Sequence, residues 1–202
     1  MVVKTALKYR LDNECEVLKY FRGRSRIRQL VDEIQEPAAI VLEHLGDNLL
    51  NASNSKRLGR LDIKFIAKGV LEALNMFHEA GYVHTGTRAW LFQSNRLTVT
   101  NADQTVDVKQ DNILVNYGDG PTRLSEVKLG DCGDTYRVDP NADPKEEGHI
   151  IGAAIFRSPE AMLNLKWGTP TDIWSFGATV SDWICSRYRR INYALLTLVR
   201  SS

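Results

Sequence analysis

Four short polar motifs, in a fixed order, constrain this chain more than any other feature of its sequence. The segment 107–112 reads Asp-Val-Lys-Gln-Asp-Asn, and it is followed by 131–133 (Asp-Cys-Gly), 158–160 (Ser-Pro-Glu) and 172–177 (Asp-Ile-Trp-Ser-Phe-Gly). Each motif alone occurs by chance, and the first alone fits a polar turn. All four in this order and at these separations indicate one common architecture.

The motifs resemble the catalytic loop, the metal-binding loop, the end of the activation segment and the following buried helix of a eukaryotic serine/threonine protein kinase. The resemblance extends from about Val2 to about Val180. It implies an α+β, protein-kinase-like bilobal fold with a small β lobe and a mainly helical large lobe. It also implies an enzyme that transfers the γ-phosphate of ATP to serine or threonine hydroxyls of a protein substrate.

The resemblance assigns roles to the polar residues of these motifs. Asp107 would orient the proton of the substrate hydroxyl, and Lys109 would lie beside the transferred phosphoryl group. Asn112 and Asp131 would supply oxygen ligands to Mg²⁺, which bridges the phosphates of the nucleotide. A lysine two residues after the base is typical of the serine/threonine members of the family.

The N-terminal stretch resembles part of a kinase small lobe. Lys4, in the predicted strand 2–6, would pair with the α- and β-phosphates of ATP. The apolar spacing of 13–21 predicts a helix, and a glutamate of such a helix holds the lysine in kinases. Glu14 fits the pattern best, and Glu16 is the alternative.

Two apolar stretches, 27–34 and 38–45, predict strands. Their position in the chain implies that Leu42 lies at the back of the adenine pocket. Glu43 and Leu45 would then present backbone groups of the hinge to the adenine edge. An ordinary buried strand fits the same residues equally well.

The rest of the chain has a regular pattern of elements. The range 61–80 predicts a helix ended by Gly81, because its apolar residues recur at spacings of three and four. That apolar stripe consists of Ile66, Val70, Leu74 and Phe77. Two short strands are expected at 113–115 and 127–129, with a turn between them.

The chain departs from the kinase pattern at both ends. We expect residues 1–46 to form a partial small lobe without the Gly-rich strands, and residues 47–180 a partial large lobe with an insertion at 86–106. Residues 181–202 do not resemble the substrate-binding helices of the family. The small lobe is therefore expected to be incomplete and the large lobe truncated.

The insertion from Gly86 to Val106 interrupts the catalytic loop. Removing it joins His84-Thr85 directly to Asp107, as the family pattern requires. One interpretation is an intron translated in frame, because Gly86-Thr87 permits a splice-donor-like codon string and 102–106 an acceptor-like one. A family-specific loop is the alternative. Either would form a protruding excursion without a core role.

These departures leave three interpretations of function. The first is a Mg-ATP-dependent kinase domain, although we expect little phosphotransferase activity from the 202 residues alone. The second is a kinase-like module that binds without catalysis, a pseudokinase. The third is a non-functional product of intron retention.

Composition excludes some other classes. The formal net charge is +1, which gives no support for a nucleic-acid or membrane-surface partner. The three cysteines lack a C-x-x-C spacing, which fits an intracellular protein, either cytoplasmic or nuclear. No signal peptide is expected after Met1, and the apolar run 193–199 is too short to cross a bilayer.

Overall fold

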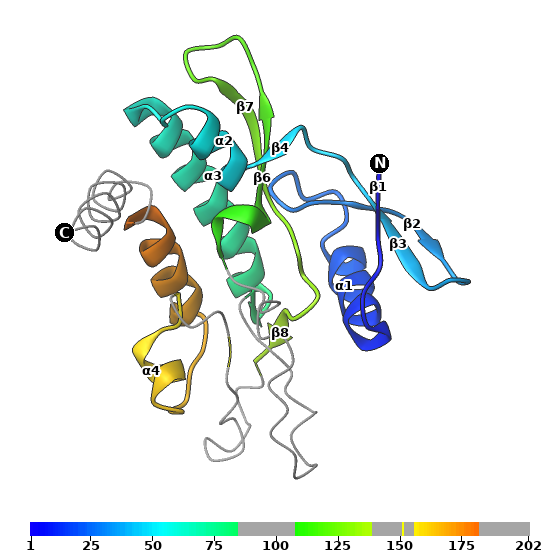
Figure 1. Cartoon of the computed structure of the whole chain (residues 1–202). Coiled ribbons are helices and arrows are strands. Elements are labelled where there is room, and N and C mark those ends of the chain that lie inside the picture. The colour runs from blue at the N-terminus through cyan, green and yellow to red at the C-terminus, as the bar shows by residue number, and fades with distance from the viewer. Residues whose placement is uncertain (85–107, 139–150, 152–155, 182–202) are drawn as a thin grey trace, which may run out of the picture.

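The computed structural model describes residues 1–84, 108–138, 151 and 156–181. They form helices and three small antiparallel sheets (Figure 1). Within those ranges, no helix combines the length and the apolar character that a membrane crossing requires. Asp107 and the predicted insertion 86–106 lie outside the described residues, as do 182–202.

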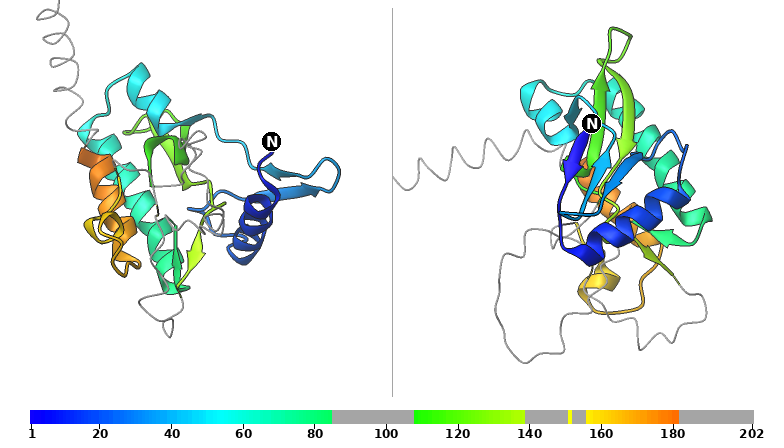
Figure 2. Two further views of the ribbon diagram at one scale, coloured as in Figure 1. Left: turned by 60° about the horizontal axis from the view of Figure 1, so that its bottom comes forward. Right: turned by 90° about the vertical axis from the view of Figure 1, so that its right-hand side faces the viewer.

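The N-terminal sheet has the strand order β1-β3-β2. Its strands are β1 (Val2–Lys4), β2 (Leu30–Ile34) and β3 (Ala39–Leu42). Helix α1 (Lys8–Tyr20) lies beside the sheet (Figure 2) and buries Val17 and Leu18. The predicted helix 13–21 is thus present but begins earlier.

Both predicted strands of this region are shorter than their apolar stretches. The stretch 27–34 is a strand only from Leu30, because Ile27 makes an isolated parallel bridge to Leu129 instead. The stretch 38–45 is a strand only over β3, which ends at Leu42. An apolar run marks burial here, and hydrogen-bond partners set the strand ends.

The second sheet has the order β4-β6-β7 and lies against helices. Its strands are β4 (Asp47–Asn48), β6 (Ile113–Tyr117) and β7 (Leu124–Leu129). Helix α2 (Leu49–Ser55) follows β4, and the Asn48 side chain caps it by accepting a hydrogen bond from the Asn51 backbone N–H. The short 3₁₀ helix η1 (Gln110–Asn112) leads into β6.

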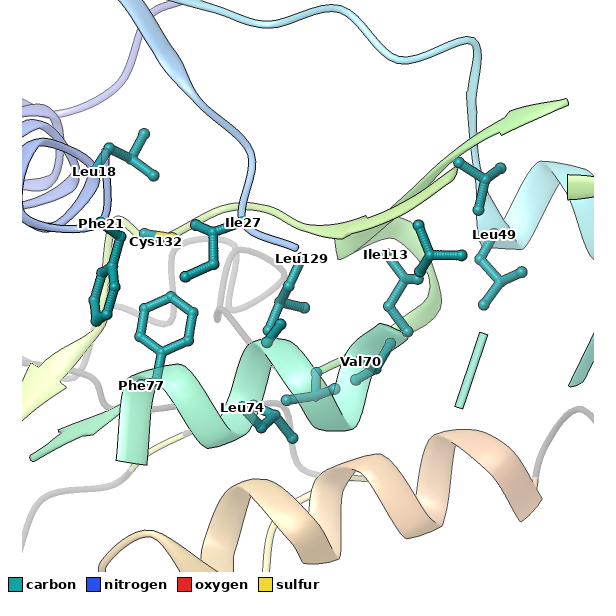
Figure 3. Packing of buried hydrophobic residues seen from close by; sticks show 14 of the residues in the cluster. Leu18, Phe21, Ile27, Leu49, Val70, Leu74, Phe77, Ile113, Leu129 and Cys132 are labelled. Atoms are coloured by element: carbon teal, nitrogen blue, oxygen red, sulfur yellow. The ribbon is translucent and has the colours of Figure 1, made fainter. Parts of the chain in front are cut away.

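Helix α3 (Arg60–Glu79) packs its predicted apolar stripe against β7. All four residues of that stripe are fully buried, so the sequence prediction is confirmed. Gly69 permits the close approach, because a Cβ added there would stand 3.1 Å from Val127 Cβ. Figure 3 shows Val70, Leu74 and Phe77 on this face of the helix.

One hydrophobic core joins the N-terminal sheet and α1 to the helices. The rings of Phe21 and Phe77 meet with centroids 4.5 Å apart, next to Ile27 and Leu18 (Figure 3). A helix over 170–181 adds Phe176 to the same core. The relative position of α1 and α3 is therefore set by shared packing.

A smaller core lies around the third sheet, which pairs β5 (Tyr82–Val83) with β8 (Tyr136–Arg137). It also holds Ile151, Ala161 of α4 (Pro159–Met162) and Trp167. The helix 170–181 that follows was expected to be buried. It is buried on one face only, because Ile173 and Trp174 are 47% and 50% exposed.

We expect alanine at Gly81 and at Gly177 to have opposite effects on stability. Gly81 ends α3 at φ +75°, where a Cβ is strained, so Gly81→Ala should lower the free energy of unfolding by about 1 kcal/mol. Gly177 lies inside helix 170–181 with open space around its Cα, so Gly177→Ala should raise it by about 0.5–1 kcal/mol. Urea denaturation measures both, and equal signs would contradict the prediction.

Candidate active site

A lysine held between two carboxylates forms the centre of the site. Lys4 Nζ lies 2.6 Å from Glu14 Oε2 and 2.6 Å from Asp131 Oδ1. These atoms come from the end of β1, the middle of α1 and the residue that follows Gly130 after β7. Two neighbouring N-terminal segments and a third that lies 127 residues after Lys4 thus converge on one charge.

The backbone of Asp131 has an unusual conformation. Its φ is +55°, a left-handed value that aspartate adopts more readily than most residues do. Such backbone conformations are concentrated at active and ligand-binding sites, where a side chain needs a defined position. Here the turn brings the carboxylate to Lys4.

Of the two glutamates that the sequence offered as partners of Lys4, Glu14 makes the contact. Glu14 is 1% exposed, and its second oxygen accepts a hydrogen bond of 3.2 Å from the Cys132 backbone N–H. Glu16 is exposed on the opposite side of α1. Residues two apart on a helix face nearly opposite directions, so only one of the pair is able to reach Lys4.

Lys4 and its two carboxylate partners attract each other, but burial still raises the pKa of Glu14. Burial opposes the charge on Lys4, but Glu14 and Asp131 outweigh it and raise the pKa of the ammonium group. Burial likewise opposes ionisation of Asp131, but Lys4 and Arg10 outweigh it and lower the pKa of the carboxyl group. Both groups are therefore ionised at neutral pH.

Two residues of α1 that the sequence analysis missed hold the 131–135 segment. The amide of Asn13 donates to the carbonyl oxygens of Gly133 and Thr135, each at 3.0 Å. Arg10 lies 3.0 Å from Asp134 and 3.8 Å from Asp131. Arg10 precedes Glu14 by one helical turn, and that spacing was the signal that could have identified it.

Asp134 is expected to make stability depend on pH. Burial raises the pKa of its carboxyl group from 3.8 to about 6, despite the opposing charge of Arg10. A raised pKa means that the folded state binds the proton more tightly, so stability falls as pH rises from about 4 to about 6. The unfolding free energy of the wild type should therefore fall relative to Asp134→Asn by about 2 kcal/mol over that window.

Urea denaturation between pH 4 and pH 7 measures this difference. The matched control is Asp12→Asn, which changes an exposed aspartate on α1. Parallel stability curves for the wild type and Asp134→Asn would contradict the prediction.

Two other residues predicted for the site lie on the segment that leads into β6. The backbone oxygen of Asn112 accepts a hydrogen bond of 2.9 Å from Gly130 N–H, and Asn112 is buried. The ammonium of Lys109 lies 3.1 Å from Asp111 Oδ2, on the same short turn. The predicted base, Asp107, lies outside the described residues.

His84 links this region to the helix 170–181. It is fully buried, and its Nε2 lies 3.0 Å from the Gly130 carbonyl oxygen. Burial lowers the pKa of His84, so the ring is neutral and donates its Nε2 proton to that carbonyl. The backbone N–H of His84 donates to Asp172 Oδ2 at 2.9 Å.

The residues predicted for the adenine site lie at and after the end of β3. Leu42 is fully buried, and Leu45 is 7% exposed. The Glu43 carboxylate accepts a hydrogen bond of 2.6 Å from Lys128, and its backbone oxygen accepts one of 2.8 Å from Arg28 Nε. Sequence reasoning did not anticipate Arg28 here.

The residues around Asp131 fit the chemistry of Mg²⁺ better than that of a softer metal. The carboxylate of Asp131 and the amide of Asn112 are hard oxygen donors, which Mg²⁺ prefers. Among the described residues, no group of three or more His, Cys, Asp or Glu side chains could hold a metal by itself. Such a pair suits an ion that is also held by phosphate oxygens and water.

The chain is similar to several protein kinases. It is 29% identical over 138 residues to the probable serine/threonine-protein kinase mkcC of Dictyostelium discoideum. It is 28% identical over 146 residues to serine/threonine-protein kinase PAK 5 of Rattus norvegicus. It is also 28% identical over 184 residues to mitogen-activated protein kinase kinase kinase 15 of Mus musculus.

These alignments cover 68%, 72% and 88% of this chain, in the same order. They cover only 12%, 16% and 12% of the relatives, so the chain spans a small part of their length. No protein-family model matches the chain.

Proposed function

Because this chain contains a protein kinase domain of the serine/threonine type, we propose that it transfers the γ-phosphate of ATP to serine or threonine hydroxyls of a protein. The observation that carries the proposal is the contact of Lys4 with both Glu14 and Asp131. That contact joins β1, α1 and the segment after β7 at one point, where a phosphate group needs a positive charge.

Each residue then has a defined task. Lys4, kept charged by its two partners, binds phosphate oxygens of the nucleotide. Asp131 and Asn112 would hold Mg²⁺, which neutralises charge on the phosphates. Asp107 orients the substrate hydroxyl, and Lys109 stabilises the transferred group.

We also propose that the chain is divided between a small lobe and a large lobe. Residues 1–46 correspond to part of a small lobe and 47–180 to part of a large lobe, with 181–202 as a distinct segment. The adenine ring would bind where the chain passes between the lobes, next to Leu42, Glu43 and Leu45. Protein substrate and nucleotide are the proposed partners, in an intracellular setting.

Phosphorylation of a serine/threonine peptide library with radiolabelled Mg-ATP tests the proposal. Asp131→Asn is the blank, because it removes the charge of the proposed magnesium ligand and keeps its shape. We expect the 202-residue chain to incorporate only a little phosphate, by a small margin above the blank, and Lys4→Met to lose that margin. Incorporation that is equal in all three chains would refute the proposed function.

A second candidate function is a kinase-like module that binds nucleotide or protein without catalysis. The separation of His84 from Asp107 by 22 residues favours it, since the family pattern has one residue between them. Mg-ATP binding without phosphorylation of any peptide would support this candidate. Transcript reads across codons 84–107 give an independent test, because a spliced transcript supports the active kinase.

A further inference from the structure

Arg28 holds a position next to the proposed nucleotide site. Its backbone N–H donates to the Leu129 carbonyl oxygen at 2.9 Å, and Leu129 N–H donates to the Arg26 carbonyl oxygen at 2.8 Å. These bonds fix residues 26–28 alongside the end of β7. Arg28 therefore lies beside Leu129, which precedes Asp131 by two residues in the chain.

The Arg28 side chain reaches from that point to the end of β3. Its Cδ lies 3.5 Å from the point where a Cβ on Gly130 would stand, and Leu114 Cδ1 lies 3.0 Å from the same point. Its Nε donates a hydrogen bond of 2.8 Å to the Glu43 carbonyl oxygen. The side chain thus spans the distance between Gly130 and Glu43.

The guanidinium stays charged because an arginine side chain does not lose its proton in proteins. Burial lowers the pKa of Arg28, and the carboxylates of Glu14, Glu43 and Asp131 act in the opposite direction. The Nε–H of an arginine is a charged donor, and such donors form stronger hydrogen bonds than neutral ones do. The bond to Glu43 is therefore costly to break.

The proposed adenine site needs the same carbonyl group. The exocyclic amine of adenine is a hydrogen-bond donor, and Glu43 supplies its expected acceptor. We propose that Arg28 fills the adenine subsite, so that an adenine nucleotide has to displace the guanidinium from the Glu43 carbonyl before its amine binds there. This inference rests on the proposed function, and it makes Arg28 the residue that sets base selectivity.

Binding of Mg-ADP to Arg28→Met tests this inference. Methionine keeps an unbranched side chain and removes both the charge and the donor, so the carbonyl becomes free for adenine. In isothermal titration calorimetry on the full chain, the Kd of Arg28→Met for Mg-ADP should be about tenfold to hundredfold lower than that of the wild type. ADP is used because it excludes turnover.

Mg-IDP separates base recognition from a general effect of charge. Hypoxanthine has an oxygen where adenine has the amine, so it donates no hydrogen bond at that position. The wild type should bind ADP and IDP with nearly equal affinity, and Arg28→Met should prefer ADP by about tenfold. A charge effect alone would change both affinities equally and would overturn the inference.

Arg26→Met is the matched control. Arg26 pairs with Glu72 on α3 at 2.7 Å, away from Glu43, so its loss should leave both affinities unchanged. Arg28→Leu, which also removes the charge and the donor, gives a second variant if Arg28→Met proves poorly folded by circular dichroism, and it should also gain a preference for ADP.

The outcomes distinguish the two proposals. If the wild type and the Arg28 variants bind ADP equally well and show the same preference between ADP and IDP, the proposed role of Arg28 is wrong. The proposed function would not be affected by that result. Absence of ADP binding in all chains would overturn both.

Discussion

Replacing Lys4 with methionine is expected to lower the free energy of unfolding by about 3 kcal/mol at pH 7.5. The substitution removes the cation that lies 2.6 Å from both Glu14 and Asp131. Glu14 is 1% exposed, so water gives its carboxylate almost no compensation. A buried charge without its partner is among the most destabilising changes in a folded protein.

The pH dependence of this loss identifies its cause. The difference between wild type and Lys4→Met should shrink toward pH 5, because burial raises the pKa of Glu14 and the loss of Lys4 removes the charge that opposes this rise. The contribution of Asp131 persists at that pH, since its pKa is lowered below 3.8 and its stabilisation is lost only as pH falls through that lower value. The double variant Lys4→Met/Glu14→Gln should be more stable than Lys4→Met alone.

Lys19→Met is the matched control for burial. Lys19 Nζ also lies 2.6 Å from a carboxylate, that of Glu33, but the two side chains are 56% and 35% exposed. The same substitution at the same distance should leave stability almost unchanged, because solvent screens an exposed pair. Similar losses for Lys4→Met and Lys19→Met in urea denaturation would show that burial of Glu14 is not the cause.

Removing the carboxylate of Asp172 is expected to cost about 2–4 kcal/mol of unfolding free energy. Asp172 is fully buried, and its Oδ2 lies 2.9 Å from the His84 backbone nitrogen and 2.8 Å from His78 Nε2. In Asp172→Ala the buried His84 N–H loses this acceptor. Asp172→Asn should cost less, because the amide oxygen still accepts that bond.

Asp47→Ala is the control for Asp172→Ala, because Asp47 makes similar hydrogen bonds but is only partly buried. Asp47 also accepts from a backbone N–H, that of Asn48, and from a side chain, the Tyr117 hydroxyl, each at 2.8 Å. Water replaces both bonds there, so the loss should be clearly smaller. Thermal and urea denaturation measure both variants, and a loss at Asp172 no larger than at Asp47 would contradict the prediction.

Local patterns explain which parts of the fold the sequence predicts well. The stripe of α3 follows from one helical period and needs no distant contact, so both its existence and its buried face agree with the structure. Gly81 ends that helix with a positive φ, as its position indicates. Strand ends were predicted less well, because Ile27 bridges to Leu129 rather than to β3.

The residues around the site that sequence reasoning missed are arginines and an asparagine. Arg10 precedes the predicted helix 13–21, Asn13 is its first residue, and Arg28 lies inside the predicted strand 27–34, so nothing in the local pattern singled them out. Each becomes part of the site only through a partner far along the chain, such as Asp134, Gly133 or Glu43. Composition and periodicity carry no information on such partners.

The sequence by itself determined the order of the motifs and the period of α3, because these depend on residue type and spacing. Only the tertiary structure decided that Glu14 rather than Glu16 lies against Lys4, since the rotation of α1 against the sheet selects one face. The same is true of Arg28, whose contact with Glu43 exists because residues 26–28 lie beside Leu129 at the end of β7. Local preference acts over a few residues, whereas packing joins positions as distant as Lys4 and Asp131.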